Sequence, residues 1–257
     1  MLERTLFFAY GVFAYVVFLG VFLYAIAFIG NLGTPTALDG PPTAPVLVGL
    51  CIDAGLLTLF ALQHSIMARR WFKERWTTIV PKPIERSTYV LFSSLALGLL
   101  FLEWRPVGGE IWSVQNPAVV FFLRALFAFG WCLVLVSTFL INHFDLFGLR
   151  QVWLHLSGRP YTTLRFRTPG PYRLVRHPLY VGWLFVFWMA PKMTAAHLVF
   201  AVATTAYILM AIRWEERDLI WEHGSAYEHY RRSVPMLVPI LARVRPAAKI
   251  PQRTEQA

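Results

Sequence analysis

The chain has 257 residues, of which 57% are hydrophobic and 15% are charged, and its formal net charge is +10 at pH 7. A soluble domain usually carries about 25% charged residues, so this composition excludes an ordinary water-soluble globule. In a membrane protein, a basic excess is typical of cytoplasmic loops, and it is poor evidence for nucleic-acid binding.

Six apolar segments follow one another along the chain. A helix needs about 20 apolar residues to cross the hydrocarbon core of a bilayer. We expect membrane helices over residues 6–29, 46–67, 89–102, 118–141, 179–190 and 195–212. The fifth is short and stops at Pro191-Lys192, so it should form a tight hairpin with the sixth. The predicted fold class is all-α, a polytopic membrane bundle of about six helices.

Basic residues indicate how this bundle is oriented. If the six helices cross the membrane in turn, nearly all of the 24 Lys and Arg share one side, the exceptions being Arg105, Arg124 and Lys192. Positive charge gathers on the cytoplasmic side of membrane proteins, so both termini are expected there. We divide the chain into residues 1–145, with four helices and substrate-side polar clusters, and residues 146–257, with the helical hairpin and a cofactor-binding tail.

Metal or disulfide chemistry is not indicated by the sequence. Cys51 and Cys132 both lie inside apolar runs and are interpreted as small hydrophobic residues. No His-x-x-x-His or His-Glu-x-x-His spacing occurs. No metal site is therefore predicted.

The helical hairpin carries the strongest chemical signal. A Pro-Gly-Pro turn at residues 169–171 gives the fifth helix an irregular start, where Arg176 and His177 stand. Glu215 and Glu216 follow the sixth helix, which returns to the same membrane face. Neighbouring helical residues point about 100° apart, so at most one acid should face Arg176 directly. These groups can lock the hairpin as ion pairs, or hold a zwitterionic ligand.

The pattern G-P-Y-x-x-x-R-H-P-x-Y-x-G, followed one helix later by E-E-x-x-L, resembles the isoprenylcysteine carboxyl methyltransferase superfamily over residues 170–239. The resemblance implies a membrane enzyme that uses S-adenosylmethionine (SAM) and yields S-adenosylhomocysteine. It places the cofactor at Tyr172, Val175, Arg176, His177, Pro178, Tyr180, Gly182, Glu215 and Glu216. Which of the two acids contacts the cofactor stays open.

Two further segments, residues 62–69 and 141–151, resemble the branch of this superfamily that methylates small volatile thiols. That resemblance implies methanethiol as acceptor, dimethyl sulfide as product and a bacterial inner membrane as location, with the active site facing the cytoplasm. The expected partners are thus the thiol and the lipid bilayer. The range of thiols and the oligomeric state stay open.

Thiol methylation needs a route for the thiol proton, because a free thiol has a pKa of about 8.5 and the thiolate is the nucleophile. His64 and His143 lie at expected cytoplasmic helix ends, and Asp145 follows His143 closely enough to orient it. Each His could instead bond a terminal helix carbonyl. We hypothesise that His64, Asn142, His143 and Asp145 line the thiol pocket, with a His-Asp pair as proton acceptor.

Rival functions remain. Sterol-type reductases share a similar Arg-His-Pro-x-Tyr-x-Gly hairpin, so an NADPH-dependent membrane reductase is one alternative. A methyltransferase for another substrate of the superfamily is a second, and a scaffold with a relic hairpin is a third. The chain length and the clusters around His64 and His143 favour the thiol methyltransferase.

Overall fold

The computed structural model describes residues 1–239, and these form a bundle of antiparallel helices. Five helices are long and apolar enough to cross a membrane: α1 (Leu2–Gly30), α2 (Val46–Ala68), α4 (Lys82–Glu103), α5 (Pro117–Ile141) and α9 (Ala195–His223). A shorter apolar helix, α8 (Pro178–Trp188), completes the hairpin with α9. This arrangement confirms the predicted all-helical, polytopic membrane bundle.

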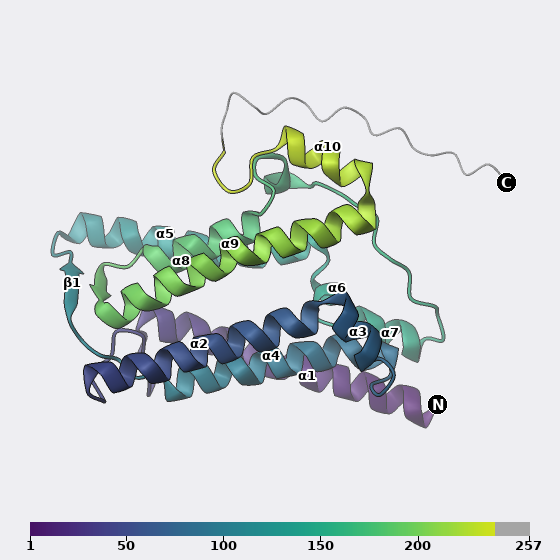
Figure 1. Cartoon of the computed structure of the whole chain (residues 1–257), viewed down its shortest axis with the longest axis horizontal. Coiled ribbons are helices and arrows are strands. Elements are labelled where there is room, and N and C mark those ends of the chain that lie inside the picture. The colour runs from purple at the N-terminus through teal and green to yellow at the C-terminus, as the bar shows by residue number, and fades with distance from the viewer. Residues whose placement is uncertain (240–257) are drawn as a thin grey trace.

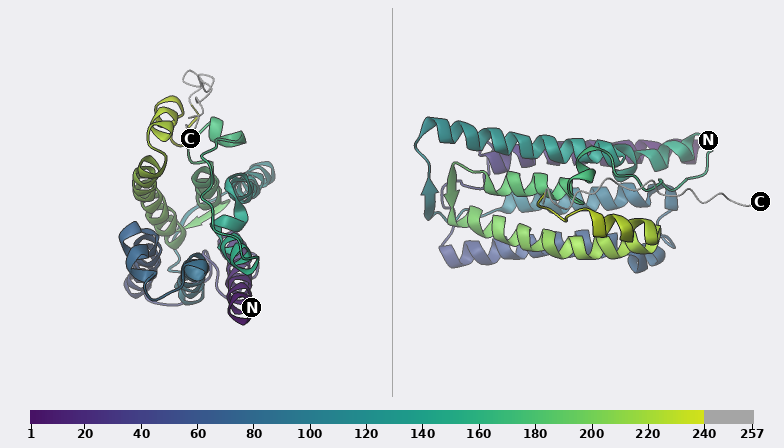
Figure 2. Two further views of the ribbon diagram at one scale, coloured as in Figure 1. Left: turned by 90° about the vertical axis from the view of Figure 1, so that its right-hand side faces the viewer. Right: turned by 90° about the horizontal axis from the view of Figure 1, so that it is seen from above.

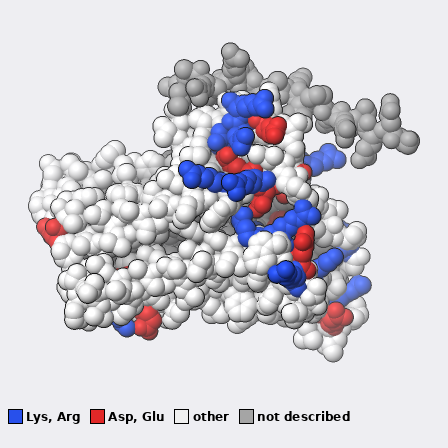
Figure 3. Space-filling model, in the orientation of Figure 1, with Lys and Arg blue, Asp and Glu red and all other residues white. Residues whose placement is uncertain are grey.

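The two ends of the bundle contain different elements, short helices at one end and two strands at the other (Figure 1). One end, here called the basic end, holds the N-terminus and the short helices α3 (Arg70–Trp76), α6 (His143–Leu146), α7 (Leu149–Leu156) and α10 (Ser225–Ser233). The other, the ribbon end, holds the antiparallel strands β1 (Glu110–Ser113) and β2 (Lys192–Thr194). Figure 3 shows most of the visible Lys and Arg gathered at the basic end.

The long helices form two layers, α1 with α2 and α4, and α5 with α8 and α9 (Figure 2). Gly130 and Gly182 let α5 and α8 approach closely, because a Cβ on either residue would lie 2.8 Å from the backbone oxygen of the other. Between the layers, α2 touches α9 less extensively than helices touch within α1–α4 or α5–α8. Aromatic contacts also join the layers, with Trp104, the residue that follows α4, edge-on to Phe200 of α9 and ring centroids 5.6 Å apart. The contact between α2 and α9 is one place where the two layers meet.

Two element boundaries differ from the sequence-based expectation. The third crossing begins at Lys82, seven residues before the predicted start at Tyr89, with Pro81 as its N-cap. Helix α9 continues past the predicted end at Ile212 as far as His223 and stops at Gly224, whose φ is 54°. Its charged extension contains no Gly or Pro and favours helix. Glu215 and Glu216 therefore lie within a regular helix and have fixed directions.

Helix α8 is too short to match its neighbours. Its 11 residues give a length of about 16 Å. The 3₁₀-helix η1 (Gly170–Arg173) precedes it, and both lie well short of the end that α9 reaches (Figure 2). The Tyr172–His177 segment is thus set back from the basic end of the bundle.

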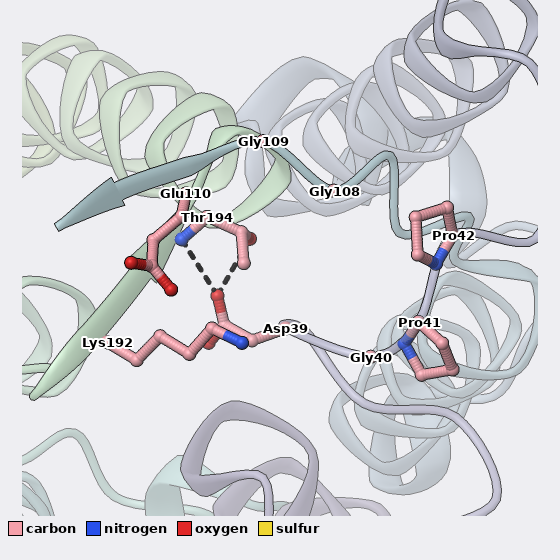
Figure 4. A pocket seen from close by; sticks show the side chains of 9 residues that line it. All are labelled: Asp39, Gly40, Pro41, Pro42, Gly108, Gly109, Glu110, Lys192 and Thr194. Atoms are coloured by element: carbon pink, nitrogen blue, oxygen red, sulfur yellow. Dashed lines mark hydrogen bonds between the residues drawn. The ribbon is translucent and has the colours of Figure 1, made fainter. Parts of the chain in front are cut away.

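The ribbon end is closed by a buried carboxylate, Asp39, in the loop after α1. One of its oxygens accepts from the Thr194 amide at 3.1 Å and hydroxyl at 2.7 Å (Figure 4). The other lies 2.8 Å from His197 Nδ1, while His197 Nε2 lies 2.9 Å from the Phe187 carbonyl. Burial raises the pKa of Asp39, but His197, Thr194 and Asn31 outweigh it and hold the pKa below its usual value.

This contact, here called the Asp39 latch, ties the loop after α1 to the turn between α8 and α9. It borders a hollow of about 550 Å³ that also includes Glu110 and Lys192 (Figure 4). His197 is one partner in this contact, through its Nδ1. The structure gives it a structural place far from the acid pair.

Candidate functional site

The hairpin brings the Arg-His pair and the two acids into direct contact. Arg176 Nε lies 2.8 Å from Glu216 Oε1, and His177 Nε2 lies 3.1 Å from the same oxygen. Glu215 instead accepts from the Tyr180 hydroxyl at 2.9 Å and lies 3.9 Å from His177 Nδ1. Because α8 and α9 are antiparallel, the start of one helix meets the late turns of the other. The two acids thus take different partners, as the 100° offset requires.

Arg176 is largely committed to the protein itself. Its Nη1 donates to the carbonyls of Arg231 at 2.8 Å and Val234 at 2.7 Å. The amides of Arg176 and His177 donate to Pro235 and Met236, at 2.8 and 3.2 Å. This side chain therefore clips the segment after α10 across the start of α8. It offers fewer free donors to a ligand than the sequence suggested.

Glu215 is the more available acid. Its side chain is 44% exposed, against 12% for Glu216, and no described residue donates a hydrogen bond to its Oε1. Glu216 already shares one oxygen between two nitrogen groups. An ammonium group of a ligand could therefore bind Glu215 while breaking fewer existing contacts than it would break at Glu216.

Two buried phenols near the acids have no hydrogen-bond partner among the described residues, those of Tyr172 and Tyr227. Burial raises the pKa of each, and Glu215 raises that of Tyr172 further, as Glu216 does for Tyr227. Both phenols therefore stay protonated at neutral pH and can donate. Leaving such a group unpaired costs about 1–3 kcal/mol, so we expect water or a polar ligand to accept from these phenols.

These groups fit the methyl donor that the sequence predicts. SAM carries an ammonium, a carboxylate, ribose hydroxyls and a sulfonium. A free carboxylate oxygen and unpaired phenol donors match a cationic ligand rich in acceptors. The residues present are thus compatible with SAM.

The remaining predicted cofactor residues have more modest places. Val175 is buried, and Pro178 occupies the first turn of α8, where a missing N–H does no harm. Gly182 was expected at the cofactor. A Cβ added to Gly182 would instead point toward α5 and lie 2.8 Å from Val134 Cγ2. Its lack of a side chain is explained by helix packing.

His64 of α2 faces α4 and forms a partly buried polar cluster with Tyr89 and Ser93, here called the His64 cluster. The Tyr89 hydroxyl is 3.0 Å from both of its ring nitrogens, and Ser93 Oγ is 3.3 Å from Nδ1. Its ring stacks on Phe60 with centroids 5.3 Å apart. Polar groups inside membrane helices are costly and tend to mark function, so this cluster is a candidate for the acceptor side.

The expected pair between His143 and Asp145 does not form. His143 Nε2 lies 2.8 Å from the Tyr15 hydroxyl and Nδ1 lies 2.8 Å from Thr138 Oγ1, so both ring nitrogens are used. Asp145 pairs instead with Arg150 at 2.8 Å. Burial lowers the pKa of His143.

Asn142 explains much of this local geometry. Its side chain caps α6 by accepting from the Asp145 amide at 3.1 Å. The cap fixes the direction of the chain between α5 and α6. The polar residues at 142–145 thus stabilise the turn between α5 and α6. Their hydrogen-bond partners could not be predicted from proximity in the sequence.

Tyr89 belongs to the His64 cluster, Tyr207 borders it, and both were missed by the sequence analysis. The Tyr207 hydroxyl lies 2.9 Å from Ser65 Oγ, which links α9 to α2. Single tyrosines within apolar runs carry no signal of their own. Only the fold places them beside a histidine.

No family model matches the chain, and no solved structure matches it. Similar curated proteins were found. The chain is 57% identical to the methanethiol S-methyltransferase of Crocosphaera subtropica over 242 residues, which cover 94% of this chain and 95% of that one. It is 50% identical to the methanethiol S-methyltransferase of Mycobacterium tuberculosis, covering 93% and 98%. It is 32% identical to nurim of Bos taurus, covering 74% and 77%.

Proposed function

The chain belongs to the methanethiol S-methyltransferase family, and we propose that it transfers the methyl group of SAM to methanethiol, giving dimethyl sulfide and S-adenosylhomocysteine. The observation that carries this proposal is the clasp of Arg176 and His177 with Glu215 and Glu216 across the α8–α9 hairpin. When bound, SAM supplies a methyl group activated by a positively charged sulfur.

Within this site we assign the ammonium group of the donor to Glu215. The free oxygen and exposure of Glu215 support this assignment, and the unpaired phenols of Tyr172 and Tyr227 supply hydrogen-bond donors for the ligand's oxygens. Glu216 and Arg176 act as positioning residues, because they fix the start of α8 and the segment after α10. Tyr180 orients Glu215 through its hydroxyl.

His64 is our candidate for the proton acceptor. It lies with Tyr89 and Ser93 in the layer that faces α9, whereas His143 is enclosed by Tyr15 and Thr138. A positioned base of this kind typically contributes about 10²–10⁴-fold to a proton-transfer step. His143, Asn142 and Asp145 then shape the basic end without taking the proton.

The basic end faces the cytoplasm in this proposal. Its support is the distribution of Lys and Arg, which follows the rule for cytoplasmic loops. The methyl donor is charged and water-soluble, so it reaches the acid pair from that side. The volatile thiol is small and apolar enough to arrive through lipid.

The test uses purified protein in detergent with methyl-labelled SAM and methanethiol. We expect labelled dimethyl sulfide in the headspace by gas chromatography, and SAM binding by calorimetric titration. A parallel titration with NADPH addresses the reductase alternative. Binding of NADPH without SAM, or SAM binding without any dimethyl sulfide, would refute the proposal.

A further inference from the structure

We propose that Tyr207 of α9 limits the size of the thiol that the enzyme accepts. The inference rests on the proposed function and adds to it a residue that sets specificity. It follows from where the side chain lies relative to the proposed proton acceptor and to the methyl-donor site.

On one side, Tyr207 borders the His64 cluster. Its hydroxyl is 2.9 Å from Ser65 Oγ, the neighbour of His64 on α2. Its ring meets Phe60 edge-on, with centroids 6.4 Å apart and planes at 68°. Phe60 in turn stacks on the His64 ring at 5.3 Å. Tyr207 is thus one aromatic ring away from His64.

On the other side, Tyr207 approaches the acid pair. Along α9, Tyr207 lies eight residues before Glu215, about two helical turns, so the two residues share roughly one face of the helix. The Tyr180 hydroxyl contacts Glu215. A thiol between His64 and the methyl donor must therefore pass or contact Tyr207.

At the contact between α2 and α9, three rings follow one another from Tyr207 through Phe60 to His64. Tyr207, Phe60 and His64 are each only partly buried although they contact one another through stacked or edge-on rings. The ring of Tyr207 is held across this contact by Ser65, so it forms a wall of fixed position. In this proposal the Tyr207 ring is the wall that leaves room for a one-carbon thiol and excludes longer chains.

The experiment compares thiols of increasing length. Rates of methylation of methanethiol, ethanethiol and 1-propanethiol are measured for the wild type, Tyr207→Ala, Tyr207→Leu and Tyr207→Phe. One methylene in a fitted pocket changes selectivity by roughly 10-fold or more. We expect Ala and Leu to raise the ethanethiol-to-methanethiol ratio of kcat/KM by about that factor, and Phe, which keeps the ring but loses the contact with Ser65, to change the ratio less than Ala does.

The matched control is Tyr24→Ala. Tyr24 also bridges two elements through its hydroxyl, to Thr36 at 2.9 Å, but it lies toward the ribbon end. It should leave the ratio unchanged. Unaltered ratios in Ala and Leu variants that still bind SAM would overturn the inference. Failure of the wild type to make dimethyl sulfide would overturn the proposed function instead, and the inference with it.

Discussion

At the scale of single residues, two adjacent carboxylates have separate surroundings. Glu216 is enclosed by Arg176 and His177, whereas Glu215 is open and touches Tyr180. Their difference comes from the 100° offset on a helix that extends beyond the apolar run. We therefore expect the same substitution at Glu215 and at Glu216 to affect different properties, namely SAM affinity and thermal stability.

Replacing each acid by Gln separates binding from stability. Glu215→Gln should weaken SAM affinity by about 10–100-fold, since a charge-assisted contact contributes about 1.5–3 kcal/mol, with little change in the thermal midpoint. Glu216→Gln should lower the midpoint, because Arg176 loses its buried charge partner. Calorimetric titration and thermal unfolding in detergent measure the two. The same loss of SAM affinity in both variants would contradict the division of roles.

His64→Gln tests the proton acceptor. We expect kcat to fall by about 100-fold or more while SAM affinity is retained. The loss should shrink as pH is raised, because more of the thiol is then ionised. His143→Gln is the control and should leave kcat near the wild-type value. A larger loss in the control than in His64→Gln would reverse the assignment.

His143 should make stability depend on pH. Burial lowers the pKa of His143 below its usual value of about 6.5, so the unfolded chain binds the proton more readily. The stabilising contribution is therefore complete above about pH 6.5 and is lost as pH falls toward the folded pKa. Thermal midpoints at pH 8 and pH 5.5 should differ less in His143→Gln than in the wild type. Equal differences in the two proteins would argue against a buried neutral imidazole.

At the scale of helices, the α5–α8 contact depends on two glycines facing each other. Gly182→Ala places a Cβ within 2.9 Å of Val134 N and 2.8 Å of Gly130 O. Backbone atoms cannot rotate away, so the helices must separate, at a cost of about 1–3 kcal/mol.

The measurement is the midpoint of thermal unfolding, with Gly55→Ala of α2 as the matched control. A Cβ on Gly55 meets nothing within 4 Å, and Ala favours helix over Gly by about 1 kcal/mol. The control should be neutral or stabilising. If Gly182→Ala behaves like the control, the close approach of α5 and α8 is not required for stability.

At the scale of the whole molecule, the N-terminus and helix α10 lie at the basic end (Figure 1), and this end should be cytoplasmic. In a background with Cys51→Ser and Cys132→Ser, Glu74→Cys of α3 and Glu110→Cys of β1 report on opposite ends. Both native side chains are exposed. A membrane-impermeant maleimide added to right-side-out vesicles should label only the Glu110→Cys protein. Labelling of the Glu74→Cys protein alone would invert the topology.

The sequence predicted the bundle and the hairpin contact for a simple physical reason. Apolar runs long enough to cross a membrane predict helices. The short turn between the last two of these helices brings Arg176 and Glu216 close together. The partners of His143 could not be predicted, since Tyr15 lies on a helix far away in sequence. The same holds for Tyr207 with Ser65 and for His197 with Asp39. These contacts depend on which helix faces meet, and uniformly apolar runs do not specify that.

The shortness of α8 has a consequence for how the two substrates meet. The hydrocarbon core is about 30 Å thick, while α8 covers only about half of that depth with its 11 residues. The proposed donor site at the start of α8 would therefore lie below the headgroup plane and be reached from the aqueous phase at the basic end. A volatile thiol dissolves readily in lipid, so the bilayer itself becomes its reservoir. Catalysis can then draw on the concentration set by partition into the membrane, even when little thiol remains in the surrounding water.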